Sequence, residues 1–155
     1  MKTMRMPSAR SAAERKEHVL KLLISEEDAW VATASPQAEV TQVPLSFAWN
    51  GAALILSTPI TSPTGRNLAT SGVVRIALGT TRDVVLIEGR VRTYTGAEIP
   101  ADLADFFAET LNWDPRGAAS GEYGYYEVEP VKVQSWREAN ELKGRTLMRE
   151  GQWLV

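Results

Sequence analysis

The chain has 155 residues, of which 44% are hydrophobic, and a formal net charge of -2. This length is typical of one domain with a sizeable core, and the small charge argues against a general binder of nucleic acids or anionic membranes. Cysteine is absent and histidine occurs once, which excludes thiolate catalysis, disulfides and cysteine- or histidine-rich metal sites. We therefore expect a cytoplasmic protein without a metal centre.

A helix is predicted from about Ser11 to Leu23. Ser11 and Glu14 have the spacing of a capping box, and apolar residues follow them. The basic residues before this helix have no apolar segment behind them, so they do not form a signal peptide. No apolar run is long enough to span a membrane. His18 lies in a charged run, where a solvated helix face is a simpler interpretation than a catalytic histidine.

Short apolar segments with features of β-strands follow, at about residues 30–35, 39–49, 52–57, 73–78, 83–94 and 125–134. Asn50 and Gly51 favour a hairpin turn between two of them, because both residues tolerate positive φ. Pro130 cannot donate a ladder hydrogen bond, so we expect it at an edge or a bulge. Glu88 and Gly89 are compatible with a bulge, and the charges around them favour cross-strand ion pairs.

Two helices are predicted between the strands. One covers about residues 64–70, and the other begins at Pro100, a residue favoured in a first turn. The second helix has apolar residues at helical spacing, which indicate core packing. Five or six strands at hairpin spacing with these helices predict a small antiparallel barrel. We assign the whole chain to one domain: an N-terminal helix at 11–23, the barrel at about 29–137, and a C-terminal tail at 136–155.

A small barrel is filled by its own side chains, so a flat cofactor would have to lie against the outer wall. A second copy of the chain often completes such a groove, which makes a symmetric dimer plausible. Hydroxyls and an arginine collect at the start of the helix after residue 57, where Ser62, Thr64 and Arg66 would suit a phosphate. The alternative is helix capping by Ser62 or Thr64 with Arg66 facing solvent, and the motif alone favours it.

The tail combines guanidinium groups with indoles. Arg145 and Arg149 are four residues apart, and Trp136 and Trp153 flank them. Guanidinium forks suit phosphates and carboxylates, and indoles stack on flat rings, so this segment suits a phosphorylated aromatic cofactor. A solvated tail anchored by two indoles is an equally good interpretation of the same residues.

Together these segments resemble the pyridoxamine 5'-phosphate oxidase-like family, the flavin-binding split barrels. The matching pieces follow the family's order from residue 30 to residue 153, at 30–34, 43–51, 57–68, 74–78, 85–89 and in the tail. The resemblance implies a six-stranded antiparallel split β-barrel. It also implies a homodimer with cofactor sites at the interface.

For the phosphate of FMN, the resemblance implies contacts from Ser62, Thr64, Arg66 and Asn67. Thr64 stands where the family commonly has a lysine, and Arg66 would supply the charge instead. The strand with Pro44 and Ser46 would lie along the flavin ring by backbone contact. Val84 replaces a family glutamine that would reach the ring.

In the tail, the resemblance assigns cofactor contacts to Trp136 and Arg149 and a substrate contact to Arg145. The histidine that true pyridoxamine-phosphate oxidases have between the paired arginines is missing, so oxidation of pyridoxamine phosphate itself is not expected. The resemblance implies an FMN-dependent oxidoreductase that transfers hydride to or from a small molecule, with no catalytic side chain identified. F420 in place of FMN, a non-catalytic flavin- or heme-binding module and a cofactor-free dimer are the alternatives. Heme ranks low among them, because it needs an axial ligand and His18 is the single histidine.

Overall fold

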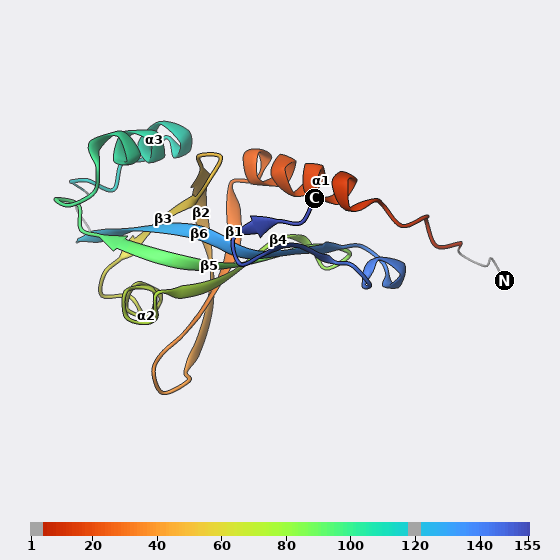
Figure 1. Cartoon of the computed structure of the whole chain (residues 1–155). Coiled ribbons are helices and arrows are strands. Elements are labelled where there is room, and N and C mark those ends of the chain that lie inside the picture. The colour runs from red at the N-terminus through yellow and green to blue at the C-terminus, as the bar shows by residue number, and fades with distance from the viewer. Residues whose placement is uncertain (1–4, 118–121) are drawn as a thin grey trace.

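The computed structural model describes residues 5–117 and 122–155, which form a β-barrel with helices around it (Figure 1). The helices are α1 (Ala12–Ser25), α2 (Pro63–Ser71), α3 (Ala101–Leu111) and the short 3-10 helix η1 (Ala139–Glu141). The strands are β1 (Asp28–Ala34), β2 (Val40–Trp49), β3 (Leu54–Pro59), β4 (Val73–Thr80), β5 (Asp83–Tyr94), β6 (Tyr123–Trp136), β7 (Thr146–Arg149) and β8 (Gln152–Trp153). Within the described part of the chain, no helix is long and apolar enough to cross a membrane.

Six strands close the barrel in the order β3-β2-β1-β4-β5-β6, because β3 also pairs with β6. All pairings are antiparallel, so the predicted six-stranded antiparallel split barrel is confirmed. Strands β7 and β8 continue the sheet beyond β6. This small hairpin was not predicted, because its strands are shorter than the pattern needed to recognise one. Its turn is made by Glu150 and Gly151, both at positive φ.

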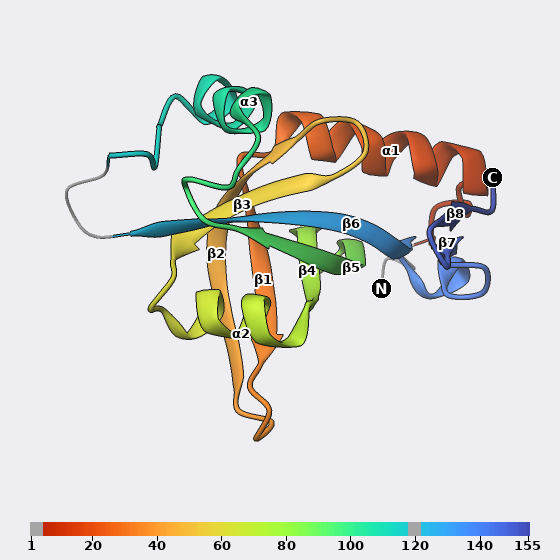
Figure 2. The same ribbon diagram turned by 60° about the vertical axis from the view of Figure 1, so that its left-hand side comes forward.

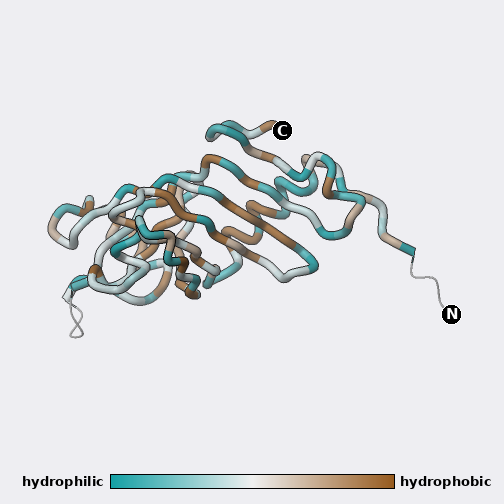
Figure 3. The backbone as a smooth tube through the Cα atoms, turned by 90° about the horizontal axis from the view of Figure 1, so that it is seen from below, coloured by the Kyte–Doolittle hydropathy of each residue, from teal (hydrophilic) through white to brown (hydrophobic). Residues whose placement is uncertain are grey.

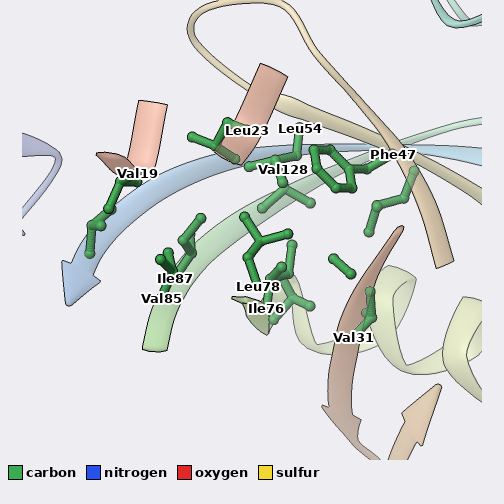
Figure 4. Packing of buried hydrophobic residues seen from close by; sticks show 14 of the residues in the cluster. Val19, Leu23, Val31, Phe47, Leu54, Ile76, Leu78, Val85, Ile87 and Val128 are labelled. Atoms are coloured by element: carbon green, nitrogen blue, oxygen red, sulfur yellow. The ribbon is translucent and has the colours of Figure 1, made fainter. Parts of the chain in front are cut away.

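The predicted capping box is present at the start of α1. The Ser11 hydroxyl accepts a hydrogen bond from the amide of Glu14, and the Glu14 carboxylate accepts one from the amide of Ser11. The helix ends at Ser25, two residues beyond the prediction. Its side chains Val19 and Leu23 are buried against the barrel, as Figure 4 shows. The capped end therefore fixes where the helix begins, and its apolar face fixes how it lies.

The barrel interior is packed with aliphatic and aromatic side chains. Val31, Leu54, Ile76 and Ile87 have no exposed surface and converge inside the barrel (Figure 4). Figure 3 shows hydrophobic residues concentrated in the strands at the middle of the molecule. Because the interior is filled by side chains, a ligand has to bind on the outer surface of the barrel.

A β-bulge interrupts the long β5–β6 ladder. Glu88 pairs with Lys132 and Gly89 pairs with Pro130, which leaves Val131 as the extra residue. The expected bulge and the expected position of Pro130 are therefore confirmed, although the inserted residue lies on β6. The carbonyl of Val131 accepts a hydrogen bond of 2.9 Å from the amide of Gly151, so the bulge also anchors the β7–β8 hairpin.

Helices α1 and α2 lie on opposite sides of the barrel (Figures 1 and 2). Helix α1 lies beside β6 and β7, whereas α2 lies beside β1, β2, β3 and β5. The C-terminus is next to the N-terminal end of α1 (Figure 2). The two motifs singled out in the sequence, the start of α2 and the tail, are thus separated in space within one chain.

Candidate cofactor site

A groove of about 430 Å³ runs along the outer wall between β2 and β3. Its lining includes two residues predicted for the flavin ring, Pro44 and Ser46. The other lining residues are Asp28, Leu45, Ser57, Thr58, Pro59, Trp113 and Tyr123. We call it the β2–β3 groove, and its end at Pro59 leads to the start of α2.

The polar groups of the β2–β3 groove are acceptors and hydroxyls. Ser46 donates a hydrogen bond of 2.6 Å to the Asp28 carboxylate, and Ser57 donates one of 2.9 Å to the carbonyl of Gly124. Among residues 5–117 and 122–155, no lysine or arginine lines the groove. A phosphate would therefore be repelled near Asp28 and favoured at the α2 end, where Arg66 lies.

At the start of α2, the Ser62 hydroxyl is already engaged. It accepts the amide hydrogen of Gly65 at 3.0 Å and donates to the carbonyl of Pro59 at 2.7 Å. Pro63 has no amide hydrogen, and the amide of Arg66 donates within the helix to Ser62. Thr64 thus keeps the one first-turn amide for which no acceptor is seen within the described residues. The structure shows helix capping by Ser62, as the motif alone favoured.

Two further residues predicted for the phosphate point inward. Thr64 and Asn67 are buried. The Asn67 amide donates to the hydroxyl of Thr33 at 3.1 Å and reaches that of Thr41 at 3.4 Å. Asn67 therefore fastens α2 to the β1–β2 hairpin. Arg66 is exposed, and one of its terminal nitrogens donates to the carbonyl of Thr61 at 2.6 Å. This bond holds the guanidinium beside the start of the helix.

In the tail, two of the three predicted residues come together. The Arg145 guanidinium lies over the Trp136 ring, 5.6 Å from its centroid, in cation–π geometry. Trp136 ends β6, where it pairs with Val84, the position of the family glutamine. Arg149 is exposed at the other end of β7, next to the turn into β8. Trp136 and Arg145 form one unit, and Arg149 stands apart from it.

The groove and the tail share the outer face of the barrel. A row of directly paired residues crosses the wall from Pro44 through Trp30, Ala77 and Leu86 to Gln134. Trp136 is two residues beyond Gln134 and so points to the same face. The fold therefore brings the predicted ring contacts and the tail tryptophan to one surface, at opposite ends, and not into one cavity.

Three residues of this surface were not singled out in the sequence. Trp30, the second residue of the row, is 50% exposed, although its neighbours Ala29 and Val31 are buried. A tryptophan at the outward position of an alternating strand is the signal that would have revealed it. Asp28 and Trp113 reach the groove from a strand end and from the loop after α3, and no local pattern marks them. Tyr123, on β6, also lines the groove.

The chain fits a phosphorylated flavin in part. The β2–β3 groove offers backbone, hydroxyl and aromatic surfaces for a planar ring and its side chain. For the phosphate, the usable groups reduce to the Arg66 guanidinium and the Thr64 amide, because Ser62 and Asn67 are engaged elsewhere. We therefore expect the ring to be held more completely than the phosphate.

Solved structures with the same fold include proteins named for cofactors. A heme-binding protein from Mycobacterium smegmatis is 17% identical, with a TM-score of 0.68, over 92% of this chain and 59% of that one. An F420 reductase is 17% identical, with a TM-score of 0.57, over 73% of this chain and 93% of that one. An FAD-binding protein from Mesorhizobium loti is 17% identical, with a TM-score of 0.61, over 81% and 92%. These identities support the shared fold alone.

No curated protein matches the chain. The family model described as pyridoxamine 5'-phosphate oxidase matches residues 16–137, which contain the whole barrel and α2. The match excludes most of the tail, the part in which the histidine of true pyridoxamine-phosphate oxidases is missing. The chain belongs to the pyridoxamine 5'-phosphate oxidase family and has its split-barrel fold.

Proposed function

We propose that the protein is a flavin-dependent oxidoreductase that binds FMN on the outer wall of the barrel. The flavin ring would lie along Pro44 and Ser46, and the phosphate would lie toward Arg66. The observation that carries the proposal is the β2–β3 groove, which ends beside an exposed arginine in a chain of this family. FMN would supply the hydride chemistry, and the protein would supply position and electrostatics.

The residues of the groove would hold and orient this ligand. Asp28 fixes the Ser46 hydroxyl through their 2.6 Å bond, so the Ser46 oxygen can accept a hydrogen bond from the ring edge. Trp113 and Tyr123 pack edge to face, with centroids 5.3 Å apart, and shield one side of the groove from water. The proposal leaves the acid, the base and the substrate unassigned.

The exposed wall supports a homodimer. Trp30 is half exposed on this wall, and a mainly apolar groove of about 440 Å³ continues the wall past Ala32, Val40 and Val73. Arg75, Glu88 and Arg90 also line this groove. An exposed apolar surface of this kind is typical of an interface. A second copy seated on it would bring its own Trp136 and Arg149 toward the first copy's groove, which one chain alone cannot do. Trp30→Lys should then yield monomers in analytical ultracentrifugation, and Ile24→Lys on α1 should not.

F420 is the second candidate, because a structure of the same fold is an F420 reductase. Heme is not proposed. His18 is the single histidine, and its Nε2 lies 2.9 Å from the Asp83 carboxylate, outside the β2–β3 groove. The cytoplasmic location expected from the sequence stays a prediction.

The proposal is tested by titrating the purified protein with FMN and with F420 and following the cofactor's absorbance. Arg66→Ala should weaken the preferred cofactor about ten- to a hundredfold, because a charged hydrogen bond to the phosphate is lost. Arg82→Ala is the matched control, since Arg82 is exposed and pairs with Glu138, away from the groove. Equal affinities of wild type and Arg66→Ala would remove Arg66 from the site. Turnover with the reduced cofactor would support an enzyme, and stable cofactor binding without turnover would support a binding module.

A further inference from the structure

The N-terminal segment and the first turn of α1 hold the C-terminal tail in place. The Asn140 amide donates to the carbonyl of Pro7 at 2.8 Å, and Lys16 lies over the Trp153 ring, 4.7 Å from its centroid. Lys16 also donates to the carbonyl of Val155 at 2.8 Å. These contacts join residues more than a hundred positions apart in the chain. Figure 2 shows the tail strands beside the N-terminal end of α1.

Glu141 is the centre of this attachment. Its carboxylate is 3% exposed and accepts bonds from Arg10 through Nε at 3.0 Å and Nη2 at 2.8 Å. It also accepts the backbone amides of Arg10 and Arg137, each at 2.7 Å. Such a forked pair fixes orientation as well as distance. Arg10 therefore sets the position of the loop that follows β6.

Arg15 fixes the same loop by donating hydrogen bonds to backbone carbonyls of the loop. Its side chain is 6% exposed, and Nη1 donates to the carbonyls of Ser135 at 3.3 Å and Gly144 at 3.1 Å, and reaches that of Glu141 at 3.4 Å. Ser135 and Gly144 directly precede Trp136 and Arg145 in the chain. A single guanidinium thus holds the backbone immediately before both members of the Trp136–Arg145 pair. A rigid indole and guanidinium arranged in this way are preorganised for a ligand.

We propose that Arg10, Arg15 and Glu141, here the Glu141 cluster, position Trp136 and Arg145 for cofactor binding. This role rests on the proposed function and extends it, because it adds Arg145, for which the resemblance implied a substrate contact, to the cofactor contacts beside Trp136. The residues of the cluster touch no ligand themselves and act through the tail. Through Arg10 and Arg15, the N-terminal segment helps to position the site. This segment lies outside the residues matched by the family model.

The first test uses the cofactor-free protein and hydrogen exchange of backbone amides. Glu141→Gln should accelerate exchange in residues 136–149 at least about tenfold, while β1 to β5 keep their protection, since a charged hydrogen bond holds the loop locally. Glu138→Gln is the matched control: it is the same substitution three residues away, at the exposed pair with Arg82. Unchanged exchange in the tail, or an equal acceleration throughout the barrel, would overturn the proposal.

The second test asks whether the cluster acts through Trp136 and Arg145. Glu141→Gln should lower FMN affinity at least about tenfold in the wild-type background and leave it unchanged in the Trp136→Ala, Arg145→Ala background. An equal loss of FMN affinity in both backgrounds would overturn the proposal that the cluster acts by positioning Trp136 and Arg145. If the wild type binds neither FMN nor F420, the proposed function fails, and the exchange experiment still decides whether the cluster orders the tail. Should Glu141→Gln fail to fold, Arg10→Gln removes the fork and leaves the Arg137 amide bonded.

Discussion

The start of α2 and the tail are both rich in hydrogen-bonding and charged residues, but they are organised over different distances along the chain. At α2, Ser62 and Arg66 bond to partners three to five residues away. In the tail, Glu141 and Arg15 bond across 120 to 131 positions of sequence. At α2, local bonds engage the Ser62 hydroxyl, whereas Arg66 stays exposed although it bonds to the carbonyl of Thr61. In the tail, Arg15 holds the backbone beside Trp136 and Arg145, and Arg145 also donates to the nearby carbonyl of Leu142. Bonds between distant parts of the chain therefore position the tail pair, whereas bonds within a few residues position the side chains of the α2 motif.

The largest expected effect is on the free energy of unfolding and concerns the long-range bonds that hold the tail. Arg15→Met removes the buried donor to three carbonyls and should lower the free energy of unfolding by about 3 kcal/mol. Arg82→Met removes an exposed ion pair and should change it by less than about 1 kcal/mol. Urea denaturation of both variants measures the difference. A small loss for Arg15→Met would mean that the tail attaches independently of this side chain.

The next effect concerns the local side. Ser62→Ala removes the cap of α2 and should lower the free energy of unfolding by about 1 kcal/mol. Ser62→Asp keeps a capping acceptor and should retain most of the stability, but its charge should weaken FMN binding by repelling the phosphate. Thermal unfolding and FMN titration of both variants give the answer. If Ser62→Ala leaves stability unchanged and weakens FMN binding, the hydroxyl serves the phosphate and the capping role is minor.

A further effect is a dependence of stability on pH. Hydrogen bonds from Arg10 lower the pKa of Glu141 to about 2, and burial opposes them. Because the folded pKa lies below the unfolded value of about 4.5, this stabilisation is complete above pH 4.5 and is lost as the pH falls toward 2. The stability difference between wild type and Glu141→Gln should therefore shrink between pH 5 and pH 3. A constant difference across that interval would show that protonation of Glu141 is not linked to folding.

The local patterns of the sequence were sufficient to predict the barrel but not the β7–β8 hairpin. The capping box at Ser11, the turn at Asn50 and Gly51, and the bulge near Pro130 are all formed. Each depends on residues a few positions apart, whose conformational preferences do not need the rest of the fold. The six alternating strands then leave few ways to bury their apolar faces, and the closed barrel is one of them.

The sequence by itself also determined which side chains are available: no thiol, one imidazole, and arginines at α2 and in the tail. Only the tertiary structure decided which of them remain free for a ligand. The Asn67 side chain points inward because it bonds to the hydroxyls of Thr33 and Thr41 on another hairpin. The Ser62 hydroxyl caps the N-terminus of its own helix. Arg10 and Arg15, from the far end of the chain, fixed the backbone around Trp136 and Arg145 through Glu141 and the carbonyls of Ser135 and Gly144. Contacts of that separation have no signature in local spacing, because they exist only once the barrel has brought both ends together.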